Sequence, residues 1–118
     1  MSFHDLVGVD VRYEDGAAVV SLDADESHLN GHGSVHGGLL ATLADIAMGA
    51  VLNAATAQDA APVTVSLVMT YLEPAPPGPT HARGTITRQG KRITITGAEI
   101  TSEDGSVVAT AVGTFTTI

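Results

Sequence analysis

The stretch from Leu39 to Ala57 constrains the fold of this chain more than any other part of its sequence. Its apolar residues cover nearly the whole circumference of a helical wheel, and such a helix is buried on most sides. Asp45 in its middle and Asn53 near its end argue against a membrane span and for the buried helix of a soluble protein. We expect a helix from about residues 36–38 to about residue 57, ending before Pro62.

The sequence on both sides of this helix has the pattern of β-strands. Residues 6–14 and 16–23 predict two strands joined at Asp15-Gly16, a pair that is typical of hairpin turns. Residues 24–35 are polar and rich in glycine, so we expect a loop there. The alternation of apolar and polar residues after the helix predicts four further strands, at residues 63–71, 80–89, 91–103 and 106–117.

One long helix among several strands predicts an α+β fold, with an antiparallel β-sheet wrapped around one long central α-helix. Short connections between the last strands favour antiparallel pairing. The length of 118 residues fits a single domain over residues 1–118. One helix cannot cover both faces of a sheet, so we expect the other face or the sheet edge to contact a second subunit.

The formal net charge of −8 limits the classes of partner that the chain can have. An acidic surface has no general attraction for nucleic acid or for anionic lipid, so we expect neither a nucleic acid nor a membrane as partner. The first five residues lack the basic and apolar segments of a signal peptide, so the cytoplasm is the expected location. The chain has no cysteine, which excludes thiolate chemistry and disulfides.

Two adjacent glycines, Gly37 and Gly38, stand at the predicted start of the helix. The first N–H groups of a helix have no intrahelical acceptor and lie at the positive end of the helix dipole. Such groups suit a carbonyl oxygen that becomes negative in a transition state, where losing one donor typically costs about 10²–10³ in rate. A tight turn that needs positive φ is another reason for glycine here, and both explanations can hold together.

Asp45 is the candidate catalytic carboxylate. Its neighbours in the same sector of the helix, Thr42, Gly49 and Asn53, are small or neutral, whereas an ordinary solvent-facing stripe carries more charge. Asp45 follows Gly37 by eight residues, which is about 12 Å at the usual helical rise. A carbonyl bound at Gly37 cannot also contact Asp45 of the same helix. If both act on one bond, they come from different chains of a symmetric dimer, the commonest kind of oligomer.

The spacing of these residues resembles the signature of hotdog-fold thioesterases of the phenylacetate-degradation (PaaI-like) group. The signature elements are Asn30, Val35–Gly38 and Leu43–Asp45. Later segments that also match are Thr64–Leu67, Tyr71–Ala75, Gly90-Lys91 and Val108–Phe115. The resemblance covers roughly residues 3–117. It implies the hotdog fold, a homodimer that often forms a dimer of dimers, and hydrolysis of an acyl-CoA thioester to a free acid and coenzyme A without a cofactor.

The resemblance also implies roles for individual residues. The Gly37 N–H polarises the thioester carbonyl, and Asn30 and His36 help to hold that end of the substrate. Asp45 of the partner chain activates water or attacks directly, and a carboxylate suits either route. Thr64 stands where the family often has a hydroxyl residue, commonly Ser, near the water. The alternatives are a hotdog hydratase or dehydratase and a non-catalytic acyl-CoA sensor, and the position of the carboxylate favours hydrolysis.

Two further groups of residues are candidates for ligand sites. Arg88, Lys91 and Arg92 form the only basic cluster, which predicts contact with the phosphates of coenzyme A, although charges at a solvated turn are common as well. His28 and His32 recur with His36 every four residues, but the glycines and Asn30 around them argue against the single helical face that a metal site would need. No metal is therefore expected.

Overall fold

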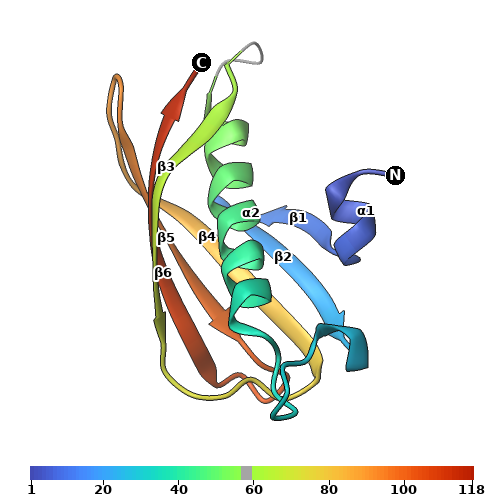
Figure 1. The fold of residues 1–118 in the computed structure, drawn as a ribbon. Coiled ribbons are helices and arrows are strands. Elements are labelled where there is room, and N and C mark those ends of the chain that lie inside the picture. Colours follow the sequence, from blue (N-terminus) through green and yellow to red (C-terminus); the bar gives the residue numbers. More distant parts are fainter. Residues whose placement is uncertain (57–59) are drawn as a thin grey trace.

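The computed structural model of this protein describes residues 1–56 and 60–118. Within these residues one sheet of six strands surrounds a long helix, and two short helices lie outside the sheet (Figure 1). The helices are α1 (Phe3–Val7), the 3₁₀ helix η1 (Glu26–His28) and α2 (Gly37–Ala55). The strands are β1 (Asp10–Glu14), β2 (Ala17–Ala24), β3 (Pro62–Tyr71), β4 (Gly78–Gln89), β5 (Thr94–Thr101) and β6 (Val107–Thr117).

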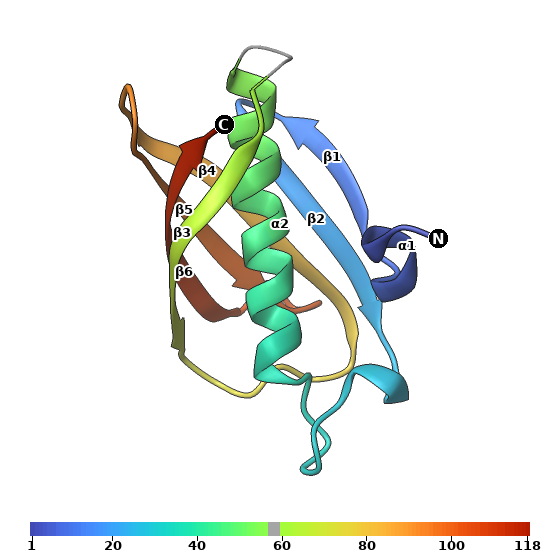
Figure 2. The ribbon, with the colours of Figure 1, turned by 45° about the horizontal axis from the view of Figure 1, so that its top comes forward.

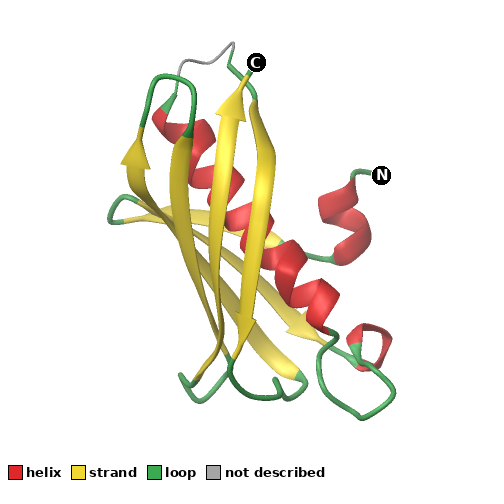
Figure 3. Cartoon of the chain, turned by 60° about the vertical axis from the view of Figure 1, so that its left-hand side comes forward, coloured by secondary structure: helices red, strands yellow, loops and turns green. Residues whose placement is uncertain are grey.

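The strands follow the order β1-β2-β4-β5-β6-β3, and all the pairings between neighbours are antiparallel. Strands β1 and β3 are therefore the two edges of the sheet. The sheet curves around α2, which lies along its concave face (Figures 1 and 2). Figure 3 shows the strands in front of the helix, with no helix or strand of residues 1–56 and 60–118 over the outer face of the sheet. The predicted fold, an antiparallel sheet wrapped around one long central helix, is confirmed.

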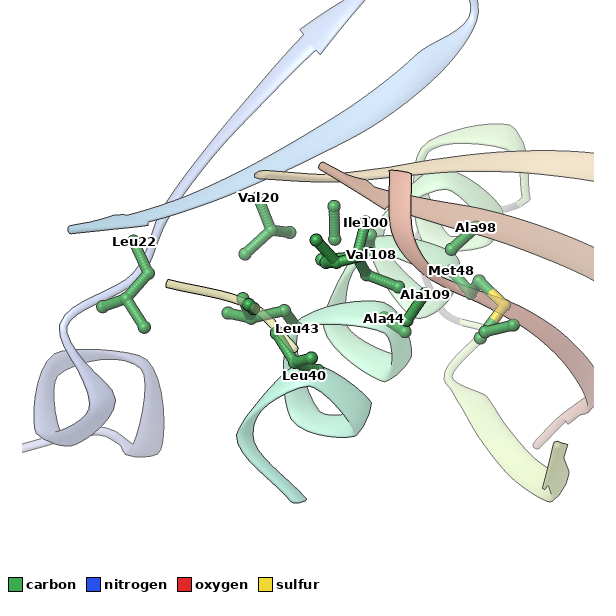
Figure 4. Packing of buried hydrophobic residues seen from close by; sticks show 14 of the residues in the cluster. Val20, Leu22, Leu40, Leu43, Ala44, Met48, Ala98, Ile100, Val108 and Ala109 are labelled. Atoms are coloured by element: carbon green, nitrogen blue, oxygen red, sulfur yellow. The ribbon is translucent and has the colours of Figure 1, made fainter. Parts of the chain in front are cut away.

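The core lies between α2 and the concave face of the sheet (Figure 4). Leu43 and Met48 of α2 are fully buried, together with Val20, Ile100 and Val108 from three different strands. Burying a side chain of this size stabilises a fold by about 1.5–3 kcal/mol relative to leaving it exposed. The buried residues of α2 are Leu40, Leu43, Ala44, Ala47, Met48, Val51 and Leu52.

Strand β4 comes so close to α2 that only glycine fits at one point of contact. A Cβ atom on Gly84 would lie 2.6 Å from both the carbonyl carbon and the carbonyl oxygen of Ala47. This distance is shorter than any tolerable contact, so a side chain there would push the helix off the sheet. The close approach fixes how deep α2 sits in the sheet and thereby which of its residues stay accessible.

By length and composition alone, α2 could cross a membrane. In this fold seven of its residues are buried, and they pack against the concave face of the sheet in the core of the chain. The expected cytoplasmic location stays a prediction.

The largest difference from the predicted elements lies at the N-terminus, where residues 6–9 were expected to be part of a strand. Residues 3–7 form α1 instead. Its start is fixed by a capping box in which the Asp5 N–H donates to Ser2 Oγ at 3.1 Å and the Ser2 N–H donates to Asp5 Oδ2 at 3.2 Å. The hairpin turn at Asp15-Gly16 is confirmed, and both residues have positive φ, 50° and 76°.

The other boundaries differ from the predicted ones by a few residues at most. Helix α2 ends at Ala55, and Ala57, where it was expected to end, lies outside the described residues. The predicted loop over residues 24–35 also contains η1.

Candidate active site

Asp45 lies on the side of α2 that the sheet leaves open. Its side chain is half-buried, and the Thr64 hydroxyl of β3 donates a hydrogen bond to Asp45 Oδ1 at 2.8 Å. Both residues line an open groove of about 840 Å³ that also includes Thr42, Gly49 and Asn53. The sector of the helix that the sequence singled out is therefore the sector that faces a cavity.

A β-bulge in β3 turns Thr64 towards Asp45. Strand β3 pairs with β6 as Thr64↔Phe115 and Ser66↔Thr114, which leaves Val65 as the extra residue. Strict alternation would put Thr64 and Tyr71, seven residues apart, on opposite faces of the sheet. The bulge reverses the alternation once, so that both side chains point to the α2 side and each reaches a residue of that helix.

The start of α2 leaves one backbone donor free. His36 is the N-cap, and its Nδ1 accepts the Gly38 N–H at 3.0 Å. The N–H groups of the next two residues, Leu39 and Leu40, both donate to the carbonyl oxygen of His36. The Gly37 N–H has no hydrogen-bond acceptor in the part of the chain that the structure describes. Of the four N-terminal N–H groups of this helix, Gly37 therefore offers the one that is available to a ligand.

Tyr71 packs directly on Gly37 and was not identified from the sequence as a site residue. Its hydroxyl donates to the Gly37 carbonyl oxygen at 2.7 Å. A Cβ atom on residue 37 would lie 3.2–3.3 Å from the Tyr71 ring and hydroxyl, closer than most such contacts. Glycine at position 37 lets the tyrosine lie against the helix start, and a larger residue would have to move the ring by a few tenths of an ångström. Two signals in the sequence pointed to Tyr71: it begins a segment that resembles the family, and it is one of only four Phe and Tyr residues in the chain.

Asn30 shapes the loop that leads into α2. Its Oδ1 accepts the N–H groups of His32 at 2.8 Å and of Ser34 at 3.2 Å, so its side-chain carbonyl is occupied. Asn30 also lines a second cavity, of about 570 Å³, together with Gly37 and Tyr71. The side-chain amide nitrogen remains as the group with which Asn30 could contact a ligand.

Within one chain the two halves of the candidate site do not meet. Asp45 and Thr64 line the first groove, whereas Gly37 and Asn30 line the second cavity, and none of these four residues lines both. This separation agrees with the eight-residue spacing along α2, which corresponds to about 12 Å.

The basic cluster lies apart from both cavities in a single chain. Arg88, Lys91 and Arg92 are exposed at the hairpin between β4 and β5 and line neither cavity. This hairpin lies at the end of the molecule where α2 finishes, opposite the loop that carries Asn30 (Figure 1). The predicted contact of the cluster with coenzyme A stays a prediction.

Two of the three histidines that recur every four residues have local structural roles. His28 accepts the Asp25 N–H at its Nδ1 at 3.0 Å, and its Nε2 lies 3.2 Å from the Val7 carbonyl oxygen. His36 caps α2. Over residues 1–56 and 60–118, no group of three or more His, Asp or Glu side chains could hold a metal ion.

Comparison with known proteins gives consistent results. Residues 32–109 match the family model described as Thioesterase superfamily. Acyl-coenzyme A thioesterase PaaI of Escherichia coli is 33% identical over 105 residues, which cover 87% of this chain and 73% of that protein. Human acyl-coenzyme A thioesterase 13 is 33% identical over 97 residues, covering 80% and 68%. The crystal structure of the BH2602 protein from Bacillus halodurans with CoA has a TM-score of 0.90 at 29% identity, covering 98% and 74%.

Proposed function

This chain belongs to the Thioesterase superfamily, and we propose that it hydrolyses acyl-CoA thioesters at a site shared between two copies of the chain. The observation that carries this function is the hydrogen bond from Thr64 of β3 to Asp45, the only charged residue of α2. The first N–H group of the same helix has no acceptor among the described residues. A fixed carboxylate and a backbone donor are the two groups that attack on a thioester carbonyl needs.

The proposed reaction assigns one role to each group. The Gly37 N–H of one copy donates to the thioester carbonyl oxygen and stabilises the negative charge that develops there. Asp45 of the other copy takes a proton from water, or attacks the carbonyl carbon itself, and the Thr64 hydroxyl keeps its carboxylate in place. On the first route the carbon–sulfur bond breaks as Asp45 returns the proton to the departing sulfur, which releases coenzyme A as the thiol and the acyl group as the free acid. On the second route the departing thiolate leaves an anhydride between Asp45 and the acyl group, and water then hydrolyses it, which releases the acid, restores the carboxylate and supplies the proton for the thiol. Asn30 and His36 hold the loop and the helix start that present Gly37.

The edge strand β3 supports a shared site. It runs for ten residues without a charged side chain, and Val65, Val68 and Tyr71 are more than half exposed. Such an edge is a template for pairing with another strand. Antiparallel pairing of two β3 strands would bring the Thr64 end of one copy beside the Tyr71 end of the other. Asp45 of one copy would then face the partner's Gly37, because Thr64 and Tyr71 hold these two residues.

The dimer would also explain the position of the basic cluster. Two antiparallel α2 helices bring the end of one helix beside the start of the other. The hairpin with Arg88, Lys91 and Arg92 would then lie near the partner's Gly37, where the coenzyme A portion leaves the site. We assign the cluster to the phosphates of coenzyme A on this ground, with Gly38 as the second glycine that keeps the helix start open to the ligand.

A dimer of dimers is the assembly that the outer face of the sheet favours. Val68 and Val112 are paired in register on β3 and β6 and are 60% and 53% exposed. No element of this chain covers them in the described residues, so two dimers could bury this face against each other.

A free-thiol release assay over a panel of acyl-CoAs tests the catalytic assignment. We expect Asp45→Ala to lower turnover by about 10² or more, the scale of a catalytic acid or base, with the oligomer unchanged. Equal turnover of the two proteins would contradict the role of Asp45.

Mixing two inactive variants tests whether the site is shared. Gly37→Pro removes the backbone N–H that forms one half of the site, at the first position of the helix where proline is tolerated, and Asp45→Ala lacks the other half. In an equal mixture of exchanging subunits, half of the dimers carry one intact site, so about a quarter of the wild-type activity should return. No recovery, with subunit exchange verified by mass spectrometry, would mean that both groups act within one chain.

A further inference from the structure

We propose that Tyr13 sets the length of the acyl chain that this site accepts, by separating the groove beside Asp45 from another, apolar cavity near the end of α2. This inference rests on the proposed function, because it concerns the acyl half of the thioester that Asp45 would act on. Four observations support it: the position of the aromatic side chains, the orientation of β1, the apolar cavity, and the row of α2 residues that runs from the groove to this cavity.

The aromatic side chains of this chain gather around the groove that contains Asp45. Only four residues are Phe or Tyr, and Phe3, Tyr13 and Phe115 all line this groove. Phe115 is buried, but Phe3 and Tyr13 are 57% and 58% exposed and therefore add little to the core. Exposed aromatic rings beside a reactive carboxylate fit the binding of an apolar group of the substrate.

The register of the sheet fixes which way Tyr13 points. Tyr13 lies opposite Ala18, and Val11 lies opposite Val20, and both partners on β2 are completely buried. Opposed residues of an antiparallel pair point to the same face, so Val11 and Tyr13 point towards α2. Arg12 between them points to the outer face, where it contacts Ser21. Strand β1 is therefore the wall of the groove across from α2.

A separate, apolar cavity of about 270 Å³ also has Tyr13 in its lining. It lies between the β1–β2 hairpin and the end of α2, and its walls include Ala17, Val51, Ala54 and Ile86. Apart from the hydroxyl of Tyr13, its lining side chains are apolar. Such a cavity favours hydrocarbon over any polar ligand.

A row of residues on α2 connects the two cavities. Ile46, Ala50 and Ala54 follow one another at intervals of four and so lie along one side of the helix. The first two line the groove with Asp45, and Ala54 lines the apolar cavity. The row begins beside Asp45 and advances about 12 Å. In the described part of the chain, Tyr13 is the one residue that lines both cavities.

These observations predict the path of the substrate. The acyl chain leaves the carbonyl at Asp45, passes between α2 and β1, and ends against the Tyr13 ring. A longer acyl chain would have to displace the ring to enter the apolar cavity. Wild-type protein should therefore prefer acyl chains that end before the ring, and removal of the ring should extend the preferred length.

The test measures kcat/KM for straight-chain acyl-CoAs from butanoyl to hexadecanoyl with wild type, Tyr13→Ala and Tyr13→Phe. We expect Tyr13→Ala to move the optimum to longer chains, with a gain of about fourfold for each further methylene that becomes buried, and Tyr13→Phe to keep the wild-type optimum. Arg12→Ala is the matched control, because it alters an exposed side chain of the same strand that points away from the groove. A Tyr13→Ala profile parallel to that of wild type would overturn the proposal.

Binding of non-hydrolysable acyl-CoA thioethers, measured by calorimetry over the same chain lengths, separates this proposal from the proposed function. A shift of the preferred length in Tyr13→Ala, with no hydrolysis by wild type, would support the role of Tyr13 in chain-length selection and reject the thioesterase reaction. Hydrolysis by wild type, with the same length preference in all variants, would support the thioesterase reaction and reject the role of Tyr13.

Discussion

The two edge strands of the sheet, β1 and β3, differ in how well they are protected from pairing with a strand of another chain. Strand β1 is five residues long, and three of its residues, Asp10, Arg12 and Glu14, are charged. Strand β3 is ten residues long and carries no charge. Short length and charged side chains protect an exposed edge from pairing with another chain. Strand β1 is therefore suited to remain an exposed edge, whereas β3 is suited to pair with a strand of another chain.

This difference matches what each edge contributes to the site. Strand β3 holds the two candidate reacting groups through hydroxyl groups near its ends, Thr64 on Asp45 at 2.8 Å and Tyr71 on Gly37 at 2.7 Å. In the described residues, strand β1 makes no side-chain hydrogen bond to either group but turns Val11 and Tyr13 towards the groove. Changes on β3 should therefore act on turnover, and changes on β1 should act on the choice of substrate.

The largest effect is expected from a charge on the unprotected edge. Val65→Lys places a cation on the bulged residue of β3, which has no partner on β6. Pairing of this edge would bury the cation against an uncharged strand, and a lysine on an edge strand opposes such pairing. The dimer should therefore dissociate and activity should fall by about 10² or more, the loss expected when the partner's donor is missing. Size-exclusion chromatography with light scattering and the thiol-release assay measure both effects.

Arg12→Glu is the control on the protected edge. It reverses a charge on β1 and removes an exposed ion pair with Glu14 at 3.3 Å, an interaction that contributes little. Oligomer and turnover should both stay as in wild type. A monomeric Val65→Lys variant with full activity would remove the basis for a shared site.

A smaller effect is expected when the hydrogen bond to the carboxylate is removed. Thr64→Val keeps the shape of the side chain but loses the hydroxyl that donates to Asp45. Hydrogen bonds to charged groups contribute about 1.5–3 kcal/mol, so kcat should fall by about tenfold to a hundredfold with little change in KM. Thr64→Ser retains the donor and should stay close to wild type. Equal losses in the two variants would mean that packing, and not the hydroxyl, matters at this position.

The smallest effect is expected from the hydroxyl at the other end of β3. Tyr71→Phe removes the donor to the Gly37 carbonyl but keeps the ring against the helix start. A hydrogen bond between neutral groups contributes about 0.5–1.5 kcal/mol, so kcat should fall by about twofold to tenfold. Tyr13→Phe removes the corresponding hydroxyl on β1 and should leave kcat unchanged. An equal fall in kcat for Tyr71→Phe and Tyr13→Phe would contradict the different roles proposed for β3 and β1.

Much of the candidate site could be predicted because it lies on one continuous helix. The apolar circumference of α2, the uncharged sector around Asp45 and the glycines at its start are properties of local sequence, and the structure has the helix at Gly37–Ala55. Tyr71 and Tyr13 could not be found in this way. Each acts on α2 from a different edge of the sheet, and no local pattern states which residues of a strand will reach a helix that is distant in sequence.

The sequence by itself determined the buried helix, the strands around it and the spacing of eight residues between Gly37 and Asp45, because periodicity and helical rise are local properties. Tertiary structure alone decided that Thr64 faces Asp45, since this depends on a bulge in the pairing of β3 with β6. It also decided that Tyr71 lies against Gly37 and that Tyr13 lines both the groove beside Asp45 and the apolar cavity. Pairing register and the depth of a helix in a sheet result from contacts between distant segments, and these contacts exist only once the chain has folded.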